Sequence, residues 1–305
     1  MTLNWNGILP ALTTPFRDDG SIDDAFLARH AHWQLDAGCN GLVALGSLGE
    51  AATLSFDEKL ALLRGLVRAL DGRAPVVAGI AALSTAEACA LARGAADAGC
   101  AGLMVLPPYV YSTDWREMRA HVGAVIDATA LPCMLYNNPI AYRTDFTPPQ
   151  VEELAGRHPN LQAVKESSAD IRRIAAIRHR LGGRIRILVG VDDVIVEGLA
   201  AGATGWVAGL VNALPRESVR LFALAQAGAG DAQSRAAADA LYAWFLPLLA
   251  LDTVLKFVQL IKLVQQQMGW GDERVRAPRL ALAGAERDAA LALIADALSR
   301  RPTLA

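Results

Sequence analysis

The segment DAGCNGLVALG, Asp36 to Gly46, has a pattern that recurs along this chain. It returns as DAGCAGLMVLP, Asp97 to Pro107, and as AAGATGWVAGL, Ala200 to Leu210. In each copy a helical stretch reaches a glycine suited to the left-handed αL conformation, and a second glycine then precedes an apolar strand. Because the copies lie far apart in the chain, they indicate that one unit of strand and helix repeats.

Eight short apolar runs alternate with amphipathic stretches, which is typical of repeated βα units and a parallel sheet. The runs are Ile8–Pro15, Gly41–Gly46, Pro75–Ile80, Gly102–Pro108, Pro132–Asn137, Leu161–Glu166, Ile185–Gly190 and Thr204–Leu210. The helical stretches between them include Asp23–Ala37, Phe56–Leu70, Ser84–Ala98 and Asp114–Thr129. Eight units within about 215 residues fit a closed (β/α)8 TIM barrel, an α/β fold, better than a doubly wound sheet.

From about Pro215 onward the pattern is helical throughout, with Ala-rich and Leu-rich segments. We therefore expect residues 1–228 to form the barrel that carries the active site, and residues 229–305 to form a C-terminal helical domain. The apolar stripe of this second part favours core packing or a subunit interface over a cofactor site.

Composition excludes several classes of function. The chain has 305 residues, 53% of them hydrophobic, and a net charge of −2, which is typical of a soluble globular protein. It has no basic field for nucleic acid and no apolar segment of membrane-spanning length, so we expect neither nucleic-acid nor membrane partners and a cytoplasmic location. The four cysteines lack CxxC spacing and the five histidines are scattered, so we predict no metal site.

The segment LQAVKESS, Leu161 to Ser168, indicates the chemistry. It is an apolar strand ending in Lys165, after which polar residues open a helix. The chain has only four lysines, and Lys165 alone stands at a strand end. A lysine held there can serve as an amine nucleophile. A lysine extending into solvent from the sheet edge remains the alternative.

Other polar residues end neighbouring strands, and in a barrel these ends meet at the active-site face. Strand two ends in Gly46-Ser47-Leu48-Gly49-Glu50, whose backbone N–H groups can hold a carboxylate. Strand five ends in Tyr136, and strand seven in Gly190 with Asp192 and Asp193, which could equally be helix caps. An amine, a phenol and an anion cradle together suit Schiff-base chemistry on a 2-oxo acid or a cyclic imino acid.

The motifs PALTTPF, GSLGE, YNNP, AVKESS and GVDD, in this order, resemble the dihydrodipicolinate synthase / N-acetylneuraminate lyase superfamily. The resemblance implies that Lys165 forms the Schiff base, that Tyr136 transfers protons, and that Ser47 with the Leu48 backbone holds the carboxylate. It also implies a (β/α)8 barrel with a C-terminal helical domain, a homotetramer built as a dimer of dimers, and no metal or organic cofactor.

Three departures separate this chain from the synthase pattern. Leu48 replaces the second hydroxyl residue of the turn after strand two. Val110 stands where the synthase has a tyrosine that reaches into the neighbouring subunit's active site. The synthase has an arginine five residues after its strand-five tyrosine, whereas here Arg143 comes seven residues after Tyr136. The GVDD segment is similar to the lyase turn whose glycine and acidic residues contact substrate hydroxyls. This similarity assigns Gly190 and Asp192 to a hydroxylated substrate.

The motif set looks most like the branch of 1-pyrroline-4-hydroxy-2-carboxylate deaminases of hydroxyproline catabolism. That resemblance implies release of ammonia and 2,5-dioxopentanoate, with Asp192 or Tyr142 at the hydroxyl end of the substrate. Arg143 either pairs with a longer or more acidic substrate or is a solvated loop charge. The alternatives are a 2-keto-3-deoxy sugar-acid dehydratase or aldolase, a 4-hydroxy-tetrahydrodipicolinate synthase, and a catalytically silent ligand-binding barrel.

Overall fold

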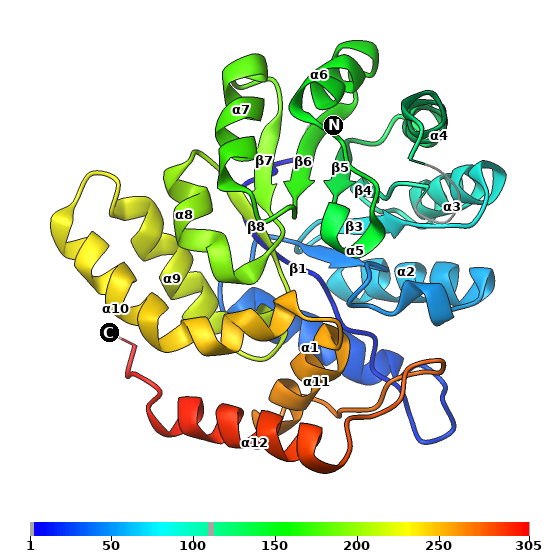
Figure 1. Cartoon of the computed structure of the whole chain (residues 1–305). Helices are drawn as coiled ribbons and strands as arrows, with labels where there is room; N and C mark the ends of the chain where they lie inside the picture. The colour runs from blue at the N-terminus through cyan, green and yellow to red at the C-terminus, as the bar shows by residue number, and fades with distance from the viewer. Residues whose placement is uncertain (1–2, 109–112, 305) are drawn as a thin grey trace.

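The protein is a (β/α)8 barrel with additional C-terminal helices (Figure 1). A computed structural model describes residues 3–108 and 113–304. The strands are β1(Gly7–Pro10), β2(Leu42–Ala44), β3(Val76–Ile80), β4(Gly102–Val105), β5(Cys133–Asn137), β6(Leu161–Glu166), β7(Arg186–Val189) and β8(Gly205–Ala208). All pair in parallel, in the order β1-β8-β7-β6-β5-β4-β3-β2, and a bridge between Ala11 and Val43 joins the two ends. The predicted barrel and its eight strands are confirmed.

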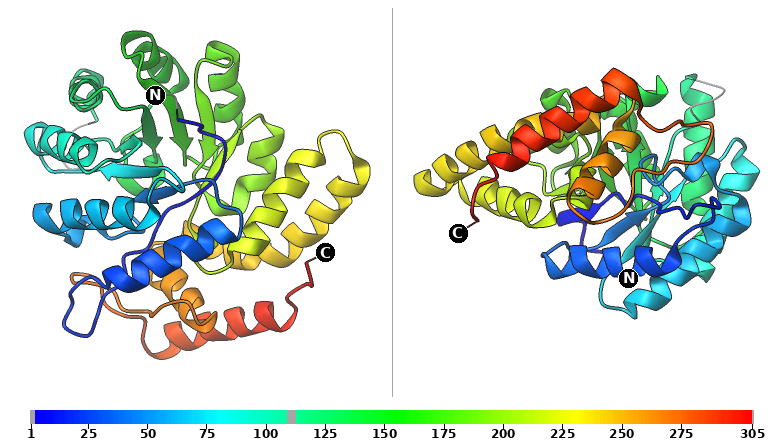
Figure 2. Two further views of the ribbon diagram at one scale, coloured as in Figure 1. Left: turned by 180° about the vertical axis from the view of Figure 1, so that it is seen from behind. Right: turned by 90° about the horizontal axis from the view of Figure 1, so that it is seen from below.

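Helices surround the sheet (Figures 1 and 2). They are α1(Asp24–Asp36), α2(Phe56–Leu70), α3(Thr85–Asp97), α4(Trp115–Asp127), α5(Pro139–Tyr142), α6(Pro148–Arg157), α7(Ile171–Leu181), α8(Ile195–Ala200), α9(Pro215–Ala227), α10(Ala232–Leu249), α11(Phe257–Gln267) and α12(Gly284–Ser299). Short 3-10 helices are η1(Ala51–Thr53), η2(Asp192–Val194), η3(Leu210–Asn212) and η4(Ala250–Thr253). The four helices predicted by range agree within two residues at each end.

Helix α2 illustrates how local sequence fixes these elements. The Ser55 hydroxyl accepts from the backbone N–H of Glu58, and the Glu58 carboxylate accepts from the backbone N–H of Ser55, which forms a capping box. Leu62, Leu66 and Leu70 recur at helical spacing and are buried against the barrel. The helix end and the buried face are therefore both set by residues within the segment.

The repeated glycines behave as the sequence predicts. Gly38, Gly99 and Gly202 follow helices and have φ of +110°, +87° and +107°, a region that residues with a side chain rarely adopt. The second glycine of the third copy, Gly205, has a different role: it lets the backbones of two paired strands approach closely. A Cβ on Gly205 would lie 3.0 Å from the carbonyl oxygen of Gly7 on the paired strand β1.

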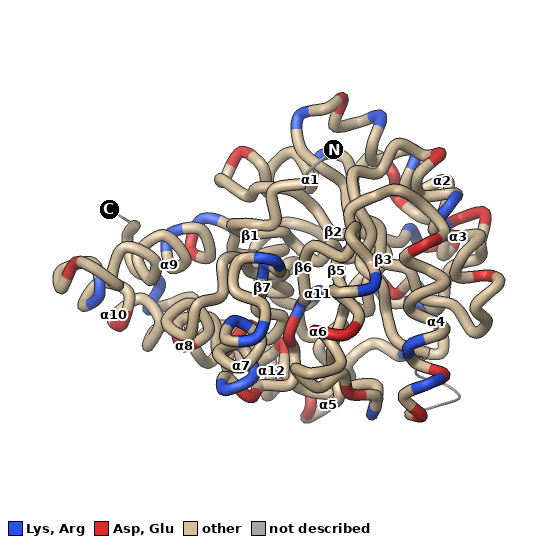
Figure 3. Tube along the Cα trace, turned by 90° about the horizontal axis from the view of Figure 1, so that it is seen from above, with Lys and Arg blue, Asp and Glu red and all other residues tan. Residues whose placement is uncertain are grey.

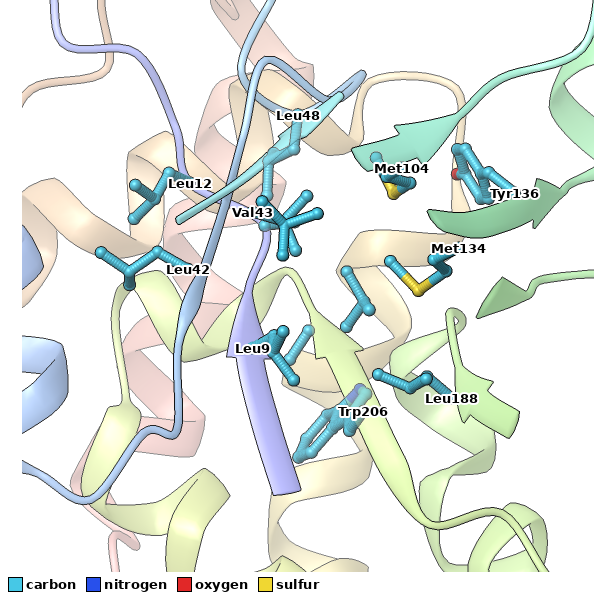
Figure 4. Packing of buried hydrophobic residues seen from close by; sticks show 14 of the residues in the cluster. Leu9, Leu12, Leu42, Val43, Leu48, Met104, Met134, Tyr136, Leu188 and Trp206 are labelled. Carbon is cyan, nitrogen blue, oxygen red and sulfur yellow. The ribbon is translucent and has the colours of Figure 1, made fainter. Parts of the chain in front are cut away.

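The barrel interior is filled by apolar side chains (Figure 4). Leu9, Val43, Met134, Leu188 and Trp206 come from five different strands, and none is more than 1% exposed. Each large apolar side chain buried in this way stabilises the fold by roughly 1.5–3 kcal/mol. The interior is therefore a packed core, and polar chemistry is confined to the ends of the strands.

The C-terminal helices pack against the barrel (Figures 1 and 2). Helix α10 lies beside α9 and α12, and α11 contacts the loops that follow β1 and β2. The division of the chain at 228/229 stays a prediction. Both signs of charge are interspersed over the surrounding helices (Figure 3). Among the described residues, no helix is long and apolar enough to cross a membrane.

Candidate active site

A cavity of about 1060 Å³ opens at the carboxyl ends of the strands. Its wall includes residues that follow β2, β5, β6, β7 and β8, together with the segment from Asp252 to Phe257 that joins α10 to α11. This is the face where (β/α)8 barrels carry their chemistry. The C-terminal part of the chain thus supplies one side of the cavity.

Lys165 and Tyr136 lie side by side in this cavity. They are directly paired in the register of β5 and β6, so their side chains leave the sheet on the same face. The Lys165 Nζ lies 4.2 Å from the centre of the Tyr136 ring, and the two residues are 6% and 5% exposed. The Tyr136 phenol oxygen accepts a hydrogen bond of 3.0 Å from the Asn138 amide. A buried amine beside an oriented phenol is suited to covalent attack followed by proton transfer.

Gly190 forms the wall directly behind the lysine. A Cβ at this position would lie 2.6 Å from Lys165 Cε and 2.0 Å from Ser167 Oγ. Ser167 is 1% exposed and lines the cavity, and its hydroxyl has no hydrogen-bond partner among the described residues. Sequence reasoning missed Ser167, although its position two residues after Lys165 on an extended segment places it on the same side.

The turn after β2 faces the lysine from across the barrel. Gly46, Ser47 and Leu48 line the cavity, and Ser47 Oγ hydrogen-bonds the Tyr142 hydroxyl. Tyr142, from the short helix α5, also stacks edge-on against Tyr136, with ring centres 5.8 Å apart. The predicted carboxylate-holding residues are therefore linked to the predicted proton-transfer residue through one aromatic side chain.

Glu50, the last residue of this turn, anchors it to the C-terminal part of the chain. Its backbone has φ of +54°, and its buried carboxylate accepts from Lys262 Nζ at 2.6 Å and from the Arg276 backbone N–H at 3.0 Å. Burial lowers the pKa of Lys262, and the charge of Glu50 opposes that shift. This ion pair joins the β2 turn to α11, a contact across more than two hundred residues that local sequence patterns do not reveal.

The two aspartates of GVDD have different surroundings. Asp192 is fully buried, and its carboxylate accepts from the Trp206 indole at 2.9 Å, from Gly209 N–H at 3.1 Å and from Leu210 N–H at 2.7 Å. Burial raises the pKa of Asp192 to about 6, against these hydrogen bonds. A contact between Asp192 and the substrate stays a prediction. In the structure η2 turns this side chain toward the β8 loop, and Asp193 is the aspartate of the pair that lines the cavity.

Arg143 had two interpretations in the sequence, a substrate contact and a solvated loop charge. It is exposed, caps the end of α5 with φ of +57°, and is not among the residues that line the cavity. The structure therefore favours the solvated loop charge over a substrate contact. The expectations for Tyr109, Val110 and Tyr111 fall outside the described residues.

Asp252 is a cavity residue that sequence reasoning missed. It lies in η4, and a Cβ on Gly209 would come within 2.2 Å of its Oδ1. Its segment, WFLPLLALDT, is part of the motif set that resembles the deaminase branch, but no function was assigned to Asp252 within it. The cavity reaches this residue only through the packing of α10 and α11 over the barrel. Among the described residues, no group of three or more His, Cys, Asp and Glu side chains is placed to hold a metal ion.

Known proteins are similar to this chain over most of its length. The sequence profile described as the dihydrodipicolinate synthetase family matches residues 4–297. A 4-hydroxy-tetrahydrodipicolinate synthase of Xanthomonas axonopodis pv. citri is 37% identical over 298 residues, covering 97% of this chain and 96% of that protein. One of Xanthomonas campestris pv. campestris is 39% identical over 231 residues, covering 75% and 76%.

Solved structures share the whole fold. The dihydrodipicolinate synthase DapA-2 of Bacillus anthracis superposes with a TM-score of 0.91 at 26% identity, covering 99% of this chain and 100% of that one. YagE of Escherichia coli, a prophage protein of the same family solved in complex with pyruvate, superposes with a TM-score of 0.89 at 26% identity, covering 97% and 99%.

Proposed function

Because this chain belongs to the dihydrodipicolinate synthetase family of Schiff-base lyases, we propose that Lys165 forms an imine with C2 of a 2-oxo acid or cyclic imino acid. The observation that carries this proposal is the buried Lys165 amine lying 4.2 Å from the centre of the Tyr136 ring. In this assignment Tyr136 moves protons, and Ser47 with the Leu48 N–H holds the carboxylate. Pyruvate bound to YagE is consistent with a small 2-oxo acid as ligand.

The favoured substrate is 1-pyrroline-4-hydroxy-2-carboxylate. The cavity wall beside Gly190 and Gly209 carries the carboxyl groups of Asp193 and Asp252, which suit a hydroxyl and repel a second carboxylate. Arg143, the candidate cation for a second carboxylate, is exposed and is not among the residues that line the cavity. Of the cations that do line it, Lys256 pairs with Glu286 and Arg279 lies 3.8 Å from the Glu50 carboxylate. A substrate with one carboxylate and a hydroxyl at the far end matches this distribution of charge.

The reaction then proceeds in five steps. Lys165 attacks C2 of the cyclic imine and opens the ring by transimination. Tyr136 assists loss of a C3 proton, and the 4-hydroxyl leaves as water. Protons then move from C5 and its amino nitrogen to C3 and C4, which converts the C5 amine into an imine. Hydrolysis of the C5 imine and of the lysine imine finally releases ammonia and 2,5-dioxopentanoate and restores the free lysine. Over the whole cycle one water is consumed for each ammonia released.

A 4-hydroxy-tetrahydrodipicolinate synthase is the second candidate. It is favoured by the curated relatives, which carry that name at 33–39% identity. It would use the same Schiff base, with pyruvate as the bound 2-oxo acid, so Lys165 and Tyr136 keep their roles. The two candidates differ in whether nitrogen is lost from the substrate.

Ammonia release separates these candidates. We expect the purified protein to release ammonia from 1-pyrroline-4-hydroxy-2-carboxylate and to show little condensation of pyruvate with aspartate semialdehyde. Borohydride should trap a substrate adduct on Lys165, and Lys165→Ala should abolish it. Condensation without ammonia would support the synthase. Water loss from a 2-keto-3-deoxy sugar acid without ammonia would support the dehydratase, and no trapped adduct at all would support a silent barrel.

A further inference from the structure

Asp252 brings a carboxyl group into the cavity from outside the barrel. It lies in η4, between α10 and α11, and it lines the cavity together with Lys165 and Gly209. Gly209 makes this approach possible, because a Cβ there would lie 2.2 Å from Asp252 Oδ1 and 2.7 Å from its Cγ. Any side chain larger than hydrogen at 209 would displace the Asp252 carboxyl from its place in the wall.

The Asp252 carboxyl is available to a ligand. None of the described residues hydrogen-bonds it, whereas the neighbouring Asp192 carboxylate accepts from Trp206 and from two backbone N–H groups. The Asp192 carboxylate therefore already binds donors of β8 and of the loop that follows it. The Asp252 carboxyl group can therefore form hydrogen bonds with a ligand that enters the cavity.

The charged groups that face Asp252 are Asp192 and Asp193 from η2 and Lys165 from β6. Burial and the charge of Asp192 raise the pKa of Asp252 well above its ordinary value, and Lys165 opposes the shift. Two carboxyl groups held close together do not both ionise readily, and the one with N–H donors keeps the charge. Asp252 is thus the member of the pair whose protonated form is favoured.

The barrel places Asp252 and Tyr136 on opposite flanks of the reactive lysine. Tyr136 projects from β5, Lys165 from β6, and Asp252 approaches beside Gly209 at the end of β8, with β7 between. A β-elimination needs one group to take the C3 proton and a second to protonate the leaving oxygen. On one flank of the lysine, the Tyr136 phenol becomes a phenolate when it protonates the departing ring nitrogen, and it can then take the C3 proton. The other flank supplies a carboxyl group for the second task.

We propose that Asp252 is the general acid that protonates the departing 4-hydroxyl. This inference rests on the proposed function and names the residue that completes its elimination step. After the C3 proton has gone to Tyr136, the enamine nitrogen re-forms the C=N bond at C2, and C3=C4 forms while C4–O breaks. The oxygen takes the Asp252 proton and leaves as water. The Asp252 carboxylate then recovers a proton from solvent.

A leaving group that needs no proton provides the test. Asp252→Asn keeps the size of the side chain and removes its acidic proton, so ammonia release from the 4-hydroxy substrate should fall by about 10²-fold or more. Turnover of the 4-fluoro analogue, which expels fluoride, should fall by less than about 10-fold. Asp252→Glu, which restores an acid, should recover part of the loss on the 4-hydroxy substrate.

Two controls make the result decisive. Borohydride trapping of pyruvate on Lys165 in Asp252→Asn must match the unsubstituted protein, which shows that the variant is folded and forms its imine. An equal loss on the hydroxy and fluoro substrates, or no loss on either, would overturn the role of Asp252. If the unsubstituted protein releases no ammonia, the proposed function itself fails and this inference falls with it, a result distinct from an active protein that is indifferent to Asp252→Asn.

Discussion

At the scale of single residues, the site depends on which atoms share the space around Lys165. The amine lies over the ring of Tyr136, and Gly190 leaves room for the lysine stem. The pairing of Lys165 with Tyr136 follows from parallel register, because residues opposite one another on adjacent strands face the same way. The pair is therefore a direct consequence of two short segments becoming neighbours in the sheet.

Removing the phenol of Tyr136 should separate imine formation from proton transfer. We expect Tyr136→Phe to lower turnover by about 10²-fold or more, because a general acid/base in the site contributes on that scale. The amount of borohydride-trapped adduct on Lys165 should stay near that of the unsubstituted protein, since the ring face against the amine is retained. A variant that turns over at the normal rate would show that another group moves the C3 proton.

At the scale of elements, helix α11 and the turn after β2 act on one another through a buried ion pair. Lys262 is 2% exposed and contacts both the Glu50 carboxylate and the Arg274 carbonyl, each at 2.6 Å. Glu50 directly follows the turn that carries Ser47, so the position of the proposed carboxylate-holding group depends on a helix of the C-terminal part. Local patterns predicted both elements but not their contact.

Breaking this pair should cost far more than breaking an exposed one. Lys262→Met removes the nearer cation of the buried Glu50 carboxylate, which keeps only Arg279 at 3.8 Å. It should lower the free energy of unfolding by about 3 kcal/mol or more, measured by urea denaturation. Lys256→Met is the matched control, because it removes an exposed ion pair with Glu286 near the same helix. It should change the free energy of unfolding by only about 0–1 kcal/mol. Similar losses in the two variants would contradict the assignment of Glu50 and Lys262 as a structural clamp.

At the scale of the whole molecule, apolar side chains are exposed around the mouth of the cavity. Ile140 follows β5, Val254 and Leu255 follow η4, and Leu255 is completely exposed. Exposed apolar groups gathered at one place mark sites of association. They are consistent with the predicted homotetramer, in which a neighbouring chain would cover this rim.

A charge on this rim should therefore weaken assembly. We expect the protein to have the mass of four chains in solution by light scattering, and Leu255→Glu to lower that mass because a carboxylate would be buried in the interface. Leu255→Met, which keeps an apolar side chain of similar volume, should keep the mass unchanged. A single-chain mass for the unsubstituted protein would refute the tetramer.

Sequence by itself determined the barrel and the side-by-side placement of Lys165 and Tyr136, because both depend on local signals. Helix caps, left-handed glycines and apolar runs lie within a few residues of one another, and strand ends of a parallel barrel necessarily meet at one face. That rule placed Lys165, Tyr136 and Ser47 together before any packing was known. It also placed Gly190 at the same face of the barrel. Only the three-dimensional contacts show that a side chain at 190 would collide with the Lys165 side chain.

Tertiary structure alone decided the far side of the cavity. The side chain of Asp192 turns away to the N–H groups of the β8 loop, and the carboxyl of Asp252 comes in from a segment that local patterns assigned only to a helical appendage. Both outcomes depend on which backbone donors and which helix pack nearby in space. These contacts join residues far apart in the chain, and no periodicity in the sequence encodes them.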